Sequence, residues 1–95
     1  MRVTLARAAE RDLREIRLYI AADDPGAADV VIGKLVKAFL PIRTNPEIGR
    51  KHPSGRYREW SVPNLPYVIP YQAGPEGIHV IRVYHTRRLK PPNWQ

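Results

Sequence analysis

The apolar residues of this chain repeat with two different periods, and the change between them falls near residue 57. From about Ala6 to Arg43 they recur every three or four positions, which is the spacing of one face of a helix. From Tyr57 to His85 they fall in short runs separated by Pro, Gly and Asn, the pattern of strands joined by turns. A helical half followed by a strand half predicts an α+β domain.

Two helices are predicted in the first half. Asp24 followed by Pro25 favours a helix start, because the carboxylate accepts hydrogen bonds from free N–H groups and proline loses nothing at the first helical position. Pro41 falls where the second helix should end, near Arg43. The link between the helices is short, so they should pack as an antiparallel hairpin. The predicted apolar stripes are Ala9, Leu13, Ile16 and Ile20 in the first helix, and Ala28, Val31, Leu35, Ala38, Phe39 and Ile42 in the second.

The second half predicts an antiparallel meander, because consecutive strand-like runs are joined by short turns. Residues 44–56 should be loop, since prolines, glycines and an asparagine break any period. Pro70 cannot donate to a ladder and must face an edge or a bulge. The strands are predicted over 2–5, 57–62, 67–72 and 78–85, the last being the longest. The predicted order is β-α-α-β-β-β, with a helical hairpin packed on one face of a small antiparallel sheet and the other face partly open as a groove.

The length and the net charge of the chain limit the classes of function that it can have. The 95 residues predict one domain over 1–95, in which 86–95 is a basic, proline-rich tail. A net charge of +7 favours an acidic partner: nucleic acid, an acidic protein or a membrane surface. No apolar run approaches the roughly 18 residues of a membrane-spanning helix, and the N-terminus does not resemble a signal peptide. With no cysteine, disulfides and thiolate chemistry are excluded, so we expect a cytoplasmic protein.

Metal and cofactor sites are poorly supported. The three histidines at 52, 79 and 85 are far apart in sequence and have no cysteine beside them, which is a weak zinc pattern. No glycine-rich loop suited to cradling phosphate is present. We therefore expect no metal and no cofactor.

The strings DLREIRLYIAADDPGAA, NPEIGR, YREW, PYVIPYQ and IHVIRVYHTRR occur in this order along the chain. Over about residues 5–88 the chain resembles toxins of the ParE/RelE superfamily of bacterial type II toxin–antitoxin systems, and the ParE branch in particular. Thr86 departs from the pattern, because ParE relatives often have glycine there. The resemblance implies the β-α-α-β-β-β fold, a cognate antitoxin with an acidic C-terminal segment that forms a hetero-oligomer with the toxin, and DNA gyrase as the target, poisoned by binding without catalysis.

The RelE branch offers an alternative, cleavage of mRNA on the ribosome. That chemistry needs a general base, cations over the phosphate and an acid for the leaving oxygen. The candidates are Arg58, Arg82, Tyr84 and His85. Alternation along the last strand places Arg82 and Tyr84 on one face and His85 on the other, so the three converge only if the strand end twists or bulges.

The binding interpretation uses many of the same side chains without requiring them to meet. Arg82 would then pair with an antitoxin carboxylate or a gyrase surface, and His85 would be structural or bind the target. Changes in the tail, including Trp94, should matter more for toxicity than changes at His85. The candidate target- or antitoxin-binding residues are Arg56, Arg58, Trp60, Tyr71, Arg82, His85, Arg87 and Arg88.

Overall fold

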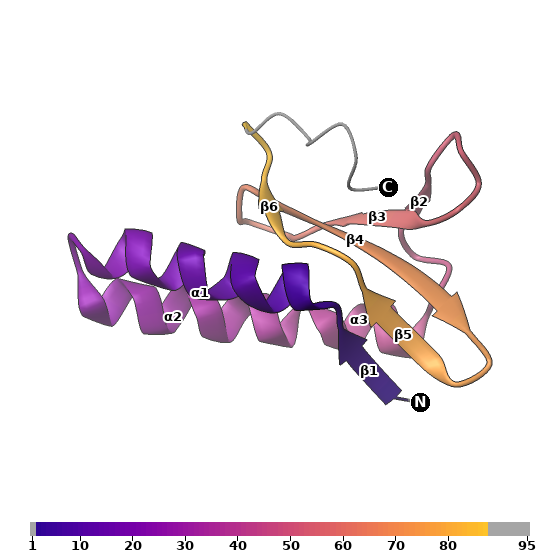
Figure 1. Ribbon diagram of the computed structural model, residues 1–95, viewed down its shortest axis with the longest axis horizontal. Coiled ribbons are helices and arrows are strands. Elements are labelled where there is room, and N and C mark those ends of the chain that lie inside the picture. Colours follow the sequence, from indigo (N-terminus) through magenta and orange to yellow (C-terminus); the bar gives the residue numbers. More distant parts are fainter. Residues whose placement is uncertain (1, 88–95) are drawn as a thin grey trace.

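The computed structural model describes residues 2–87 and has the predicted α+β architecture (Figure 1). A first strand leads into two long helices that lie side by side, and a sheet follows. The end of the hairpin where α1 joins α2 projects beyond the sheet (Figure 1). The elements are β1 (Arg2–Leu5), α1 (Arg7–Ala21), α2 (Pro25–Lys37), α3 (Phe39–Thr44), β2 (Arg50–Lys51), β3 (Arg58–Ser61), β4 (Tyr67–Gly74), β5 (Gly77–Val80) and β6 (Tyr84–His85).

The second helical segment begins as predicted but divides before its end. The Asp24 carboxylate accepts a hydrogen bond of 3.1 Å from the Ala27 N–H, which caps α2. The prediction of one helix to about Arg43 is wrong, because α2 ends at Lys37 and α3 starts two residues later. Pro41 explains the break, since it has no N–H to bond the Lys37 carbonyl and its ring crowds that position.

The sheet has the strand order β1-β5-β4-β3-β2, and β6 pairs with β4 beyond the end of β5. Its pairs are antiparallel except one: β1 runs parallel to β5, with Val3 opposite Ile78. A parallel neighbour needs a long connection, and the helices and the remaining strands supply it. The segment 44–56, predicted as loop throughout, contains the two-residue strand β2, which pairs with β3.

One face of the sheet packs on the helices and forms the core. Both predicted apolar stripes face inward, and the helical side of β4 and β5 completes the buried cluster. Asp12 and Glu59 are the charged residues buried among the described ones. No helix in the described range is long and apolar enough to cross a membrane. Buried core residues include Ala9, Ile16, Leu35, Phe39, Ile42, Ile69, Tyr71, Ile78, Val80 and Val83.

The predicted continuous strand over 78–85 is wrong, because β5 ends at Val80 and pairing resumes only at Tyr84. Pro70 on β4 lies at this gap. The Ile81 N–H donates to the Pro70 carbonyl at 2.9 Å. Because the nitrogen and the carbonyl of a strand residue point to the same side, the Pro70 nitrogen, which carries no hydrogen, also faces this segment. Between the pairs Tyr71–Val80 and Val68–Tyr84, three residues (81–83) lie opposite two (69–70). The expectation that Pro70 faces an edge or a bulge is therefore confirmed, as a bulge.

Candidate functional site

Arg82 lies in the gap between β5 and β6 and turns toward α1. Its guanidinium donates two hydrogen bonds to the Asp12 carboxylate, at 2.7 and 3.0 Å. The same carboxylate accepts the Val83 N–H at 3.0 Å. The hydrogen bonds that Arg82 donates to Asp12 raise the pKa of Arg82 above its ordinary value, against the opposing effect of burial. Arg82 is therefore held by a partner within its own chain.

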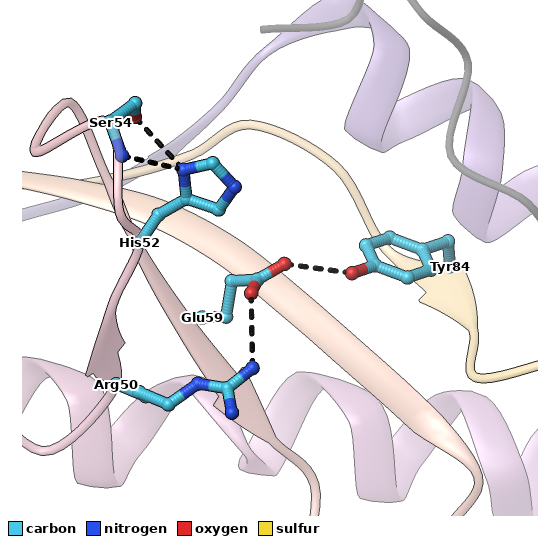
Figure 2. A network of polar contacts seen from close by, with 5 residues as sticks. All are labelled: Arg50, His52, Ser54, Glu59 and Tyr84. Carbon is cyan, nitrogen blue, oxygen red and sulfur yellow. Dashed lines mark hydrogen bonds and ion pairs between the residues drawn. The ribbon is translucent and has the colours of Figure 1, made fainter.

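Tyr84 belongs to a polar network on the face of the sheet away from the helices (Figure 2). Its hydroxyl donates to the buried carboxylate of Glu59 at 2.8 Å, and Arg50 approaches that carboxylate at 3.7 Å. Burial raises the pKa of Tyr84 well above its ordinary range, and the hydrogen bond and negative charge of Glu59 raise it further. A phenol in this setting holds its proton strongly. In the same region, His52 accepts the Ser54 N–H at 3.1 Å (Figure 2). The His52 ring also stacks on Tyr57, with ring centroids 4.3 Å apart.

His85 lies opposite Tyr67 in the β4–β6 pair, and their rings meet edge to face with centroids 5.4 Å apart. Its Nδ1 accepts the backbone N–H of Arg87 at 3.1 Å, while the Arg87 side chain is exposed. His85 therefore has a ring neighbour and a backbone partner. Arg88, Trp94 and most of the predicted 86–95 tail lie outside the described residues.

Arg58 and Tyr71 stand opposite each other on β3 and β4 and hold the segment before β2. Arg58 donates to the carbonyls of Glu47 and Gly49, at 3.4 and 3.0 Å. The Tyr71 hydroxyl donates to the Pro46 carbonyl at 2.7 Å and accepts the Gly49 N–H at 2.9 Å. Tyr71 is 0% exposed, and burial is the main cause of its raised pKa. Its ring thus supports the fold from inside.

The four residues of the RNA-cleavage alternative are not brought to one point. Arg82 binds α1, Arg58 binds the loop before β2, and Tyr84 binds Glu59. The register puts Tyr84 and His85 on opposite faces, as predicted. The expectation that Arg82 shares a face with Tyr84 is wrong, because alternation does not carry across residues 81–83, which belong to no strand.

Two further predicted binding residues occupy different settings. Trp60 on β3 is partly buried and packs against the core, and its Nε1 has no hydrogen-bond partner among the described residues. Arg56 lies before β3 with an exposed side chain, and its carbonyl accepts a hydrogen bond from Gln72 at 3.1 Å.

An open hollow of about 670 Å³ lies where the β4–β5 turn meets β1 and the start of β3. Its lining contains one carboxylate, Glu76, and four cationic side chains: Arg2, Lys51, Arg56 and Arg58. We call these four residues and the space between them the basic hollow. Sequence reasoning found Arg56 and Arg58 but missed Arg2 and Lys51. Arg2 arrives through the parallel register with Gly77, and no local pattern signals that pairing.

The site offers charge and hydrogen-bond donors. Within residues 2–87 no three His, Cys, Asp or Glu side chains gather as metal ligands would. The hollow presents cations to an anionic guest, and the polar network around Glu59 keeps its phenol protonated. The charge of the hollow suits recognition of an anionic partner.

The chain matches, over residues 3–90, the family described as "ParE toxin of type II toxin-antitoxin system, parDE". It is similar to the "Putative toxin Y4kP" of Sinorhizobium fredii, with 32% identity over 81 residues that cover 85% of this chain and 83% of that protein. Its fold is similar to a chain of the "Chromosomal ParDE TA system from P. aeruginosa", with a TM-score of 0.77 and 22% identity over 90% of this chain and 95% of the other. Because the family match spans nearly the whole chain, this protein belongs to the ParE toxin family of type II toxin–antitoxin systems.

Proposed function

We propose that this toxin acts by binding DNA gyrase and trapping it on broken DNA, and that it does not cut RNA. A cognate antitoxin with an acidic C-terminal segment neutralises it. Action on gyrase requires the toxin to work in the cytoplasm. Inhibition by binding needs a complementary surface and no catalytic group.

The separation of Arg58, Arg82, Tyr84 and His85 supports binding over cleavage. Attack of a 2′-OH on its phosphate needs a base, an acid and cations directed at one atom. Arg82 is bound to Asp12 through two hydrogen bonds, and Tyr84 donates a hydrogen bond to Glu59. These side chains stabilise the fold in the positions where a nuclease would need them free.

Surface chemistry supports an acidic, partly apolar antitoxin segment. The net charge of +7 steers an acidic chain toward the toxin. On the helical hairpin, Leu18, Tyr19 and Val30 are 70%, 77% and 57% exposed, which is apolar surface without cover in the described chain. A segment combining carboxylates with apolar side chains would match both features and become ordered on binding.

Two parallel assays test the proposal. Purified toxin is added to gyrase with supercoiled DNA, and separately to ribosomes programmed with mRNA. We expect cleaved DNA–gyrase complexes to accumulate while the mRNA stays intact. Cut A-site codons together with unaffected gyrase would overturn the proposal in favour of RNA cleavage.

Single variants sharpen this test. His85→Ala should keep most gyrase inhibition, because binding does not depend on its proton chemistry, whereas under cleavage the same change should abolish activity. Arg87→Ala should weaken inhibition more than His85→Ala, since Arg87 is exposed. Thermal unfolding of each variant is the control that separates a lost contact from a lost fold.

A further inference from the structure

We infer that the basic hollow binds the phosphodiester backbone of DNA, without regard to base sequence. This inference rests on the proposed gyrase target, because gyrase holds DNA beside any inhibitor bound at its cleavage site. The hollow would then give the toxin a second contact, to the DNA itself, in addition to its contact with gyrase protein.

The four cations of the hollow form no ion pair among the described residues, and they outnumber the one carboxylate in its lining, Glu76. The ion pairs among residues 2–87 are Arg17–Asp29, Arg50–Glu59 and Arg82–Asp12, and none includes a hollow residue. Lys51 and Arg58 are directly opposite each other across β2 and β3. Like charges in that register repel, so their placement costs stability until an anion lies between them.

Donor capacity remains available in the hollow. Arg58 uses one nitrogen for its two backbone carbonyls, and a guanidinium carries five N–H donors in all. The side chains of Arg2, Lys51 and Arg56 are exposed. Arginine forks match phosphate oxygens in pairs, and a lysine adds a point charge.

The lining favours phosphate over either bases or a peptide. Tyr57 and Tyr71 are 5% and 0% exposed, so neither phenol ring offers a platform for stacking bases. The third ring in the lining, His79, is exposed and forms a hydrogen bond with Thr4. A bound peptide needs an apolar anchor, and no large exposed apolar residue lines the hollow. Among residues 2–87, the large exposed apolar residues are Leu18, Tyr19, Val30, Val36, Leu40 and Ile48.

The test measures binding of the full chain to a labelled DNA duplex of about 20 base pairs by fluorescence anisotropy, at several salt concentrations. Four phosphate contacts predict a slope of log affinity against log salt of roughly −3.6. The double variant Lys51→Gln/Arg56→Gln should reduce the slope to about −2 and weaken binding at least about tenfold at low salt. Neither the Lys51 nor the Arg56 side chain makes a hydrogen bond or ion pair in the described structure, so folding of this variant should be preserved. A second double variant, Arg2→Gln/Arg56→Gln, repeats the test with the cation that β1 contributes to the hollow.

The matched control is Arg11→Gln/Arg14→Gln, which removes the same charge from the exposed surface of α1. It should retain wild-type slope and nearly wild-type affinity. Equal losses in the control and the hollow variants would show a general charge effect and overturn the inference. Absence of DNA binding by the wild type would also overturn it, as would tighter binding of a matched RNA or a glutamate-rich peptide.

The same proteins are then assayed for gyrase–DNA cleavage complexes, which separates the two proposals. If the wild type traps gyrase and the hollow variants trap it equally well, the DNA-binding inference is wrong while the gyrase proposal stands. If the hollow binds DNA but the wild type leaves gyrase unaffected, the gyrase proposal fails instead. Trapping by the wild type that is weakened only in the hollow variants supports both.

Discussion

Arg82 and Asp12, 70 positions apart in the sequence, form a two-bond ion pair that fastens α1 to the chain between β5 and β6. The Asp12 carboxylate also accepts the Val83 N–H, so one buried side chain satisfies a backbone group left by the gap in the ladder. The arginine that the sequence offered as a phosphate ligand is a structural residue in this fold. Its loss should therefore appear first in stability.

Arg82→Ala should lower the free energy of unfolding by about 3 kcal/mol, because it leaves the Asp12 carboxylate buried without its charge partner. Urea unfolding measures this change. Arg82→Lys should recover only part of it, since one ammonium cannot form both parallel bonds.

The matched control for this prediction is Arg17→Ala. Arg17 also pairs with an aspartate, Asp29, but both side chains are largely exposed, at 47% and 71%. Its removal should cost less than about 1 kcal/mol. If Arg82→Ala lowers the free energy of unfolding no more than Arg17→Ala does, the buried ion pair contributes no more to stability than the exposed one.

Tyr84→Phe should make the protein less sensitive to alkali. Folding raises the pKa of Tyr84 above its ordinary value of 10.0, mainly through burial and then through the hydrogen bond to Glu59. The stabilisation from this phenol is fully present below pH 10 and is lost as pH rises toward the folded value, because the unfolded chain releases the proton first. Wild-type stability should therefore fall more steeply above pH 10, by up to about 1 kcal/mol per pH unit once partial exposure is allowed for.

Urea unfolding between about pH 8 and 11.5 measures that slope, with Tyr19→Phe as the comparison. Tyr19 is 77% exposed, so its loss should leave the wild-type slope unchanged. Identical slopes for wild type and Tyr84→Phe would mean that the Glu59 contact does not retain the phenol proton.

Tyr71→Phe should destabilise the protein by about 2 kcal/mol. The change removes a buried hydroxyl that donates to Pro46 and accepts from Gly49, leaving both backbone groups unpaired. Hydrogen exchange should speed up at the Gly49 amide before it does in the helices, because the bond to that amide is lost directly. Unchanged protection of Gly49 would contradict the assigned contact.

Gly77→Ala should be strongly destabilising, and Gly33→Ala should be stabilising. Gly77 has φ of 143°, and a Cβ there would lie 2.0 Å from the Arg2 carbonyl oxygen, so the β1–β5 pair would have to separate. Gly33 lies inside α2 with nothing within 4 Å of an added Cβ, so alanine should add about 0.8 kcal/mol through helix propensity. The melting temperature should fall in Gly77→Ala and rise in Gly33→Ala. A shift of both melting temperatures in the same direction would contradict the prediction.

Much of the fold was predictable because its signals are local. Ala9, Ile16 and Leu35 recur at helical spacing and are buried, and the Asp24–Pro25 start was read from two adjacent residues. The Pro70 bulge was also anticipated, since a missing N–H is a property of one residue. The positions of the breaks were less predictable, because α2 and β5 end where local preference competes with packing and pairing.

The candidate site was harder to predict. Alternation along the strand correctly predicted that Tyr84 and His85 lie on opposite faces of the sheet. It failed for Arg82, because the prediction assumed a continuous strand where the ladder is interrupted. Arg2 and Lys51 carried no motif that linked them to Arg56. Charge composition predicted an anionic partner without indicating where its contacts would lie.

The amino-acid order by itself determined the two helices, most of the strands and the excess of positive charge, because each follows from spacing or composition within a short window. Only the tertiary structure decided that Arg82 is committed to Asp12 and that Arg2 stands beside the β4–β5 turn. Those contacts join residues 70 or more positions apart, and they depend on a parallel register and a broken ladder that arise only when the elements pack.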